Sequence, residues 1–146
     1  MRIEASDIRS IKLFKYYRLV RKWACKTYNM TDADIELLIY LDCVEYFTRN
    51  DFIEGIYIYS WDKHRFQRLL RNGWIKIWRE RNRTTQKYNI YTTSTKCRLL
   101  ITRMYKMLLG EEDIPTSKVG VFYKNKTYTD KVFNQAIDKM IKDKDR

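Results

Sequence analysis

Proline and glycine are scarce in this chain, and their scarcity limits the folds open to it. Its 146 residues contain one proline and four glycines. An all-β sandwich of many turns needs these residues, so their scarcity argues against such a fold. Long helices with short connections are expected instead, and the length suits one domain with its own core. We therefore predict a single, mainly α-helical domain over residues 1–146.

Hydrophobic spacing and helix-start signals predict where the helices lie. Apolar residues recur every three to four positions, as on one face of a helix. Thr31 with Asp34, and Thr48 with Asp51, have the spacing of capping boxes, and Asn72-Gly73 is a left-handed helix stop. The predicted helices are residues 8–28, one from Thr31, a short one from Thr48, then 60–71, 95–109 and 128–143.

Two segments near the middle of the chain predict strands. Residues 74–79 and 87–92 are rich in β-branched and aromatic side chains, and a polar link joins them. The link lacks glycine, which favours a longer loop over a tight turn. Three helices followed by a two-stranded ribbon indicate a winged helix-turn-helix with extra N- and C-terminal helices. Its recognition helix and wing would span residues 59–92.

Charge is distributed unevenly along the chain, whose formal net charge is +12 at pH 7. Residues 31–59 carry one basic and seven acidic side chains, whereas residues 60–103 carry twelve basic and two acidic ones. Basic residues that only keep the protein soluble are one explanation. An acidic segment beside a strongly basic one is not needed for solubility, and it favours a polyanionic partner.

The predicted helix over residues 60–71 is apolar on one side and rich in hydrogen-bond donors on the other. The major groove of B-DNA admits one helix, in which arginine can pair with guanine and glutamine with adenine. Trp61 either meets a thymine methyl group or a sugar, or packs under a neighbouring side chain. The candidate DNA contacts of this helix are Ser60, Trp61, His64, Arg65, Gln67, Arg68 and Arg71.

The tip of the predicted hairpin is strongly basic. The tip contains a single acidic residue, Glu80, and four cations, Arg79, Arg81, Arg83 and Lys87. Such a tip can follow a phosphate backbone or enter a narrow minor groove. We therefore add these four cations to the candidate DNA contacts.

The region from Trp61 to Thr95-Lys96-Cys97-Arg98-Leu99-Leu100 resembles the MarR family. The pattern R-x-x-x-L-x-x-x-G-hydrophobic is matched by Arg65, Leu69, Gly73 and Trp74. Residues 80–83 read Glu-Arg-Asn-Arg where the family usually has Asp-x-Arg, and Cys97 replaces an expected glycine. The resemblance implies a homodimer whose interface helices would be residues 8–28, 95–109 and 128–143.

No catalytic or metal-binding pattern is found in the sequence. His64 is the only histidine, and neither a triad nor a metal site can be built around it. Glu111-Glu112-Asp113 is expected to be a solvated connector, and Gly-rich phosphate loops are absent. Cys25, Cys43 and Cys97 are widely spaced, so we expect buried free thiols. We predict no enzymatic activity, no cofactor and no metal.

We therefore expect a cytoplasmic, nucleoid-associated, dimeric regulator of transcription that binds double-stranded DNA. No uncharged apolar stretch is long enough to cross a bilayer, so no membrane partner is expected. The alternative is a non-catalytic winged-helix protein with an architectural or assembly role in a nucleoprotein particle. The Lys, Asn, Ile and Tyr bias suggests an AT-rich genome and is compatible with a phage-encoded protein. The sequence does not identify an effector.

Overall fold

The described residues form two compact units. The computed structural model describes residues 2–12, 14–53, 64–82, 84–85, 87–115 and 128–144, except the side chains of Ile11 and Lys144. Unit 1 comprises residues 1–30 and 103–146, and unit 2 comprises residues 31–102. The predicted DNA contacts all fall in unit 2. A single domain over residues 1–146 stays a prediction.

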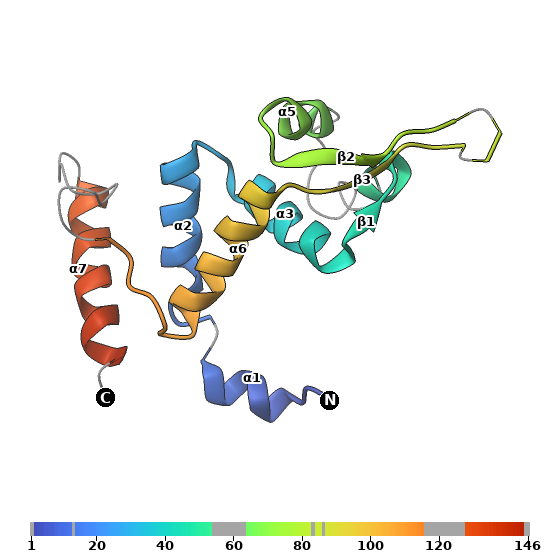
Figure 1. The fold of residues 1–146 in the computed structure, drawn as a ribbon. Helices are drawn as coiled ribbons and strands as arrows, with labels where there is room; N and C mark the ends of the chain where they lie inside the picture. The colour runs from blue at the N-terminus through green and yellow to red at the C-terminus, as the bar shows by residue number, and fades with distance from the viewer. Residues whose placement is uncertain are drawn as a thin grey trace. The chain divides into compact units, whose positions relative to one another are not determined.

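Unit 2 combines helices with a small antiparallel sheet (Figure 1). Its elements are α3 (Asp32–Val44), β1 (Tyr46–Phe47), a helical segment at residues 49–53, α5 (Arg65–Arg71), β2 (Ile75–Arg79), β3 (Ile90–Thr93) and the first part of α6 (Thr95–Leu108). The strand order is β1-β3-β2. A mainly helical chain with a β-hairpin is confirmed. The third strand, β1, was not predicted.

The helix starts of unit 2 follow the capping signals in the sequence. At α3, the backbone N–H of Asp34 donates to Thr31 Oγ1 at 3.2 Å, and the Thr31 N–H donates to Asp34 Oδ2 at 3.2 Å. Thr48 and Asp51 form the same reciprocal pair ahead of residues 49–53. Both predicted starts are confirmed.

The end of α5 is a Schellman motif. Gly73 has a φ of +81°, its N–H donates to the Leu70 carbonyl, and the Trp74 N–H donates to the Leu69 carbonyl. A side chain other than glycine is strained at this φ, so the residue is required by the turn. The predicted left-handed stop is confirmed.

An aromatic cluster holds α5 against the sheet. The Phe66 ring makes edge contacts with Phe52 and Tyr91, at centroid distances of 4.9 Å each. Tyr91 also stacks on Phe47 of β1. Because these rings come from four different segments, their burial fixes α5 relative to β1 and β3.

Unit 1 contains α1 (Ala5–Ile11), α2 (Tyr17–Tyr28), the end of α6 and α7 (Tyr128–Lys144). The prediction of one continuous helix over residues 8–28 is wrong. Lys12 lies in the left-handed region with a φ of 54°, and this ends α1. A lysine is not a typical residue for that conformation, so the sequence carried no signal for the break.

Helices α2 and α7 pack against each other. Leu19, Val20 and Trp23 of α2 are all buried. Lys26 also donates to Asp130 at 2.5 Å, and the Arg103 guanidinium lies 4.9 Å from the Trp23 ring. No helix within the described ranges is long and apolar enough to cross a bilayer.

The three cysteines are free thiols in different environments. Cys25 and Cys97 are buried, as expected, whereas Cys43 is exposed near the end of α3 and corrects the prediction of three buried thiols. Burial raises the pKa of Cys97 to about 12. The Cys97 thiolate, which is the reactive form, is therefore scarce at neutral pH.

We expect one of the three thiols of the native protein to react rapidly with a thiol reagent at pH 8. Only Cys43 combines exposure with a free thiol. Cys43→Ser should remove the rapid phase, measured spectroscopically, and denaturant should expose two further thiols. Rapid labelling of Cys97 in the native protein would contradict the packing of α6 described here.

Candidate nucleic-acid interface

Helix α5 presents a short polar face to solvent. Gln67 and Arg71 are exposed, while Phe66 and Leu69 are buried. These positions place the centre of the solvent face at Gln67 and Arg71. His64, which precedes the helix as its N-cap residue, is also exposed.

Arg65 does not belong to this face, which corrects its prediction as a DNA contact. Its side chain is buried against α3, where Nη1 donates to Asp34 Oδ1 at 2.5 Å and to Thr31 Oγ1 at 3.3 Å. The residue is 6% exposed. The arginine is turned inward because a buried carboxylate compensates its charge.

Arg68 is shared between the interior and the solvent face. Its Nη2 donates to the same Asp34 Oδ1 at 3.1 Å, and its side chain is 41% exposed. One carboxylate therefore caps α3 and holds two arginines of α5. Because both arginines lie on α5, Asp34 also sets the rotation of this helix about its axis.

The base of the hairpin is stiffened by exposed aromatic rings. Trp78 of β2 packs on Tyr46 of β1 at 4.5 Å between centroids, and the Arg79 guanidinium lies 4.9 Å from the Trp78 ring. The register between β2 and β3 is irregular between Ile77 and Arg79. Arg79 is exposed at this point, as predicted for a cation of the wing.

The link beyond β2 is organised by two asparagines. The Arg81 N–H donates to Asn89 Oδ1 at 2.6 Å, across the base of the link. Asn82 Oδ1 accepts from the N–H groups of Thr84 and Thr85. The side chains of Arg81 and Lys87 are exposed. A longer loop without a tight glycine turn was predicted, and the structure confirms it.

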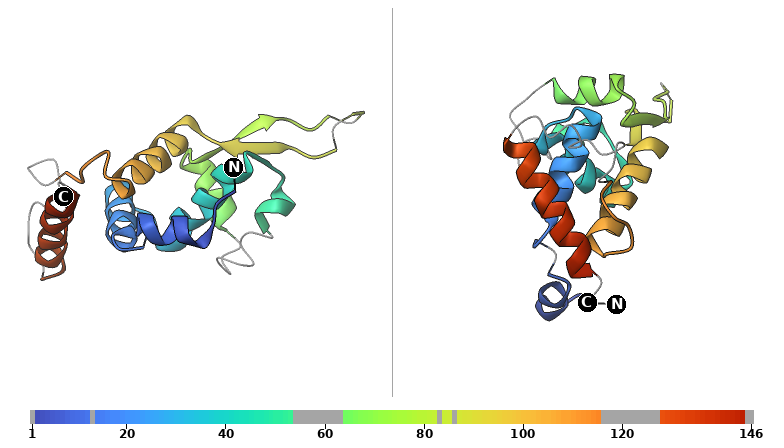
Figure 2. Two further views of the ribbon diagram at one scale, coloured as in Figure 1. Left: turned by 90° about the horizontal axis from the view of Figure 1, so that it is seen from below. Right: turned by 90° about the vertical axis from the view of Figure 1, so that its left-hand side faces the viewer.

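Three predicted contacts, Ser60, Trp61 and Arg83, lie outside the described residues. The remaining exposed or half-exposed candidates belong to α5, to the residue before it and to the hairpin. Figure 1 and the right view of Figure 2 both show α5 and the hairpin on the same side of α3. The exposed or half-exposed candidates at these elements are His64, Gln67, Arg68, Arg71, Arg79, Arg81 and Lys87.

Sequence reasoning missed two cations here, the exposed Lys76 of β2 and Arg49. Arg49 is the only basic residue of the acidic segment 31–59, so the local sequence did not mark it as a candidate contact. The structure places its guanidinium 5.6 Å from the centre of the Phe66 ring of α5. Only the tertiary pairing of β1 with β3 brings the chain at Arg49 to the hairpin.

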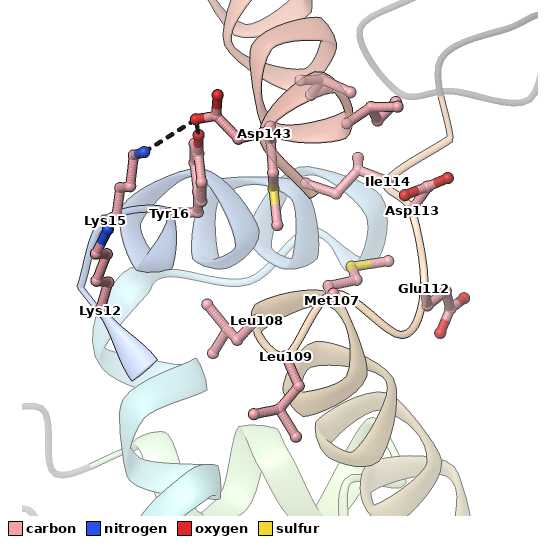
Figure 3. A pocket seen from close by; sticks show the side chains of 14 residues that line it. Lys12, Lys15, Tyr16, Met107, Leu108, Leu109, Glu112, Asp113, Ile114 and Asp143 are labelled. Atoms are coloured by element: carbon pink, nitrogen blue, oxygen red, sulfur yellow. Dashed lines mark hydrogen bonds and ion pairs between the residues drawn. The ribbon is translucent and has the colours of Figure 1, made fainter. Parts of the chain in front are cut away.

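Unit 1 contains a pocket of about 340 Å³ (Figure 3). Its lining includes the buried side chains of Met107, Ile137 and Met140. At its edge Lys15 donates to Asp143 at 2.9 Å, and the Tyr16 hydroxyl donates to the same oxygen. The hydrogen bond to Asp143 raises the pKa of Lys15, and partial burial raises the pKa of Tyr16.

The charged groups around this pocket are of both signs and favour neither anionic nor cationic ligands. Ammonium groups of Lys12 and Lys15 and carboxylates of Glu112, Asp113 and Asp143 all line it. Among the residues that the structure describes, no group of three or more metal-ligating side chains converges. The exposed charge of α5 and the hairpin, by contrast, is mostly positive.

Comparison with protein-family models, curated proteins and solved structures finds no match for this chain. The resemblance to the MarR family stays a prediction. A function for the chain therefore depends on the geometry of its own residues.

We expect Asp34→Ala to lower the free energy of unfolding by about 3–5 kcal/mol, because it leaves the buried Arg65 charge uncompensated. Asp32→Ala is the control, since this first-turn carboxylate is exposed and its loss costs about 0.3–1 kcal/mol. The measurement is urea-induced unfolding. Adding Arg65→Met to Asp34→Ala should recover part of the loss. Equal losses for the two aspartates would contradict the central role of Asp34.

Proposed function

We propose that the protein binds double-stranded DNA through unit 2. The observation that carries this proposal is the strongly basic character of one segment, residues 65–93, which forms α5 and the hairpin. Its exposed charged residues are Arg71, Lys76, Arg79, Arg81 and Lys87, with Glu80 as the acidic exception among the described residues of these elements. A surface of this charge attracts phosphate backbones.

The arrangement of elements supports a winged helix-turn-helix. A helix, a short strand, two helical segments and a hairpin follow one another, with strand order β1-β3-β2. In this fold α5 would enter the major groove, and the hairpin would lie along the backbone as the wing. The width of the major groove suits a single helix.

The geometry favours different roles for the polar side chains of α5. Gln67 and Arg71 would face base edges, since both side chains are exposed. Arg68 would reach the groove only with the part of its guanidinium that Asp34 leaves available. Arg65 would act by positioning α5 and not by reading bases.

One observation favours the alternative of an architectural role with little sequence preference. Four arginine and glutamine side chains of α5 were expected to contact bases or to lie beside those that do. Two of them, Arg65 and Arg68, are bonded to Asp34. The exposed charge is concentrated on the hairpin, which would contact phosphates and carry no sequence information. Binding dominated by the wing would suit a protein that packages DNA or joins a nucleoprotein particle.

A homodimer is part of the proposal. Unit 1 exposes large apolar side chains, among them Phe14, Leu109, Tyr128 and Val132. Exposed apolar side chains are typical of an interface where they lie together. Two copies would present two α5 helices to half-sites about one helical turn apart. Such a dimer would act in the cytoplasm, on the nucleoid, as a regulator of transcription.

We expect affinity for duplex DNA to fall with salt, because cations of the protein release counterions from phosphates. Arg81→Ala should flatten the slope of log K against log salt by about one. Arg9→Ala, which removes an exposed arginine of α1 in unit 1, is the matched control. Fluorescence anisotropy of a labelled duplex measures the slope. Identical slopes for the two variants would argue against the hairpin as a contact.

Sequence preference separates the regulator from the architectural protein. Selection of duplexes from a random pool, followed by titration, should give a preference of about 10³ or more for a regulator. Gln67→Ala or Arg71→Ala should then relax the preference at individual base pairs by about 1–3 kcal/mol each. A preference near one in the unmodified protein would favour the architectural role.

A further inference from the structure

A basic hollow of about 200 Å³ lies at the base of the hairpin. It is bounded by the start of the helical segment after β1 and by the two sides of the link beyond β2. Its lining residues are Thr48, Arg49, Asn50, Arg81, Lys87, Tyr88, Asn89 and Tyr91. We name this feature the basic hollow.

The charge of the basic hollow is one-sided. Arg49, Arg81 and Lys87 contribute three cations, and no carboxylate lines it. Within the described part of the chain, none of these cations forms an ion pair. Asp51, the acidic residue nearest Arg49 in sequence, accepts from the Thr48 N–H at 2.8 Å. Glu80, which precedes Arg81, does not line the hollow. Three clustered cations repel one another, and an anion would relieve this repulsion.

The walls of the basic hollow are held in place before any ligand binds. Asn89 accepts from the Arg81 N–H at 2.6 Å and donates to the Tyr91 hydroxyl at 3.4 Å. The Arg49 guanidinium lies over the Phe66 ring. A site organised in advance loses less entropy when it binds an ion than a set of mobile side chains does.

The position of the basic hollow indicates its ligand. Arg49 touches α5 through Phe66, while Arg81 and Lys87 belong to the hairpin. A duplex that meets both α5 and the hairpin would pass its backbone over this point. Asn and Tyr side chains add neutral hydrogen-bond donors of the kind that contact phosphate and sugar.

From these observations we infer that the basic hollow binds one phosphate group of the DNA backbone, with Arg49 as its central contact. The inference rests on the proposed function and adds to it a phosphate contact that lies between the recognition helix and the wing. This contact orients the duplex on unit 2, because it fixes one phosphate relative to both elements. Bases play no part in it, so it is independent of sequence.

The first test compares salt slopes. Arg49→Gln removes the charge and keeps an unbranched polar side chain, so it should flatten the slope of log K against log salt by about 0.9. Arg9→Ala in unit 1 should leave the slope unchanged. Thermal unfolding of Arg49→Gln confirms that the variant is folded. A slope equal to that of Arg9→Ala would overturn the inference.

The second test locates the phosphate. Single phosphates of the duplex are replaced by neutral methylphosphonates, and each duplex is titrated with the unmodified protein and with Arg49→Gln. At one position the two losses should be non-additive, because both changes remove the same contact. Additive losses at every position would overturn the inference.

A third test distinguishes binding of a backbone phosphate from binding of a free anion. Inorganic phosphate alone, titrated by calorimetry, should show no saturation at micromolar concentration. Micromolar binding that Arg49→Gln abolishes would assign the hollow to a free anion and overturn the inference. If the unmodified protein binds no duplex at all, the proposed function fails as well. If Arg81→Ala flattens the slope and Arg49→Gln does not, only the assignment of the hollow fails.

Discussion

A single buried carboxylate, that of Asp34, organises unit 2. It closes the capping box that starts α3, and one of its oxygens accepts from both Arg65 and Arg68 of α5. A charge this deeply buried, 3% exposed, is tolerable only with such partners. Because two arginines on one helix share it, α5 is fixed both in position and in rotation. The exposure of Gln67 and Arg71 follows from that rotation.

The four residues that match the MarR-like pattern hold α5 in place. They do not determine which bases α5 would contact. Arg65 bonds to Asp34, Leu69 is buried, Gly73 adopts the positive φ of the helix stop, and Trp74 is buried. Residues available to a ligand lie between these positions, at Gln67 and Arg71. A structural pattern of this kind can be shared by proteins with different ligands. It therefore supports the winged-helix proposal more directly than it supports a regulatory role.

Local signals predicted much of the fold, and tertiary effects account for the misses. Thr31 with Asp34 marked the start of α3, and Gly73 marked the end of α5, because both signals act within a few residues. The two-residue strand β1 was missed, since its pairing partner lies more than forty residues away. Arg65 was predicted to be exposed because the buried partner, Asp34, is on another helix. Arg49 was overlooked for the same reason, since only the folded chain places it beside the hairpin.

Backbone amide shifts during a titration with duplex DNA test the central claim most directly, because they map the bound surface residue by residue. The account predicts that shifts concentrate in α5 and at residues 79–89, with Arg49 among them, while amides of α7 are unaffected. Shifts confined to unit 1, with α5 and the hairpin unchanged at saturating duplex, would contradict it.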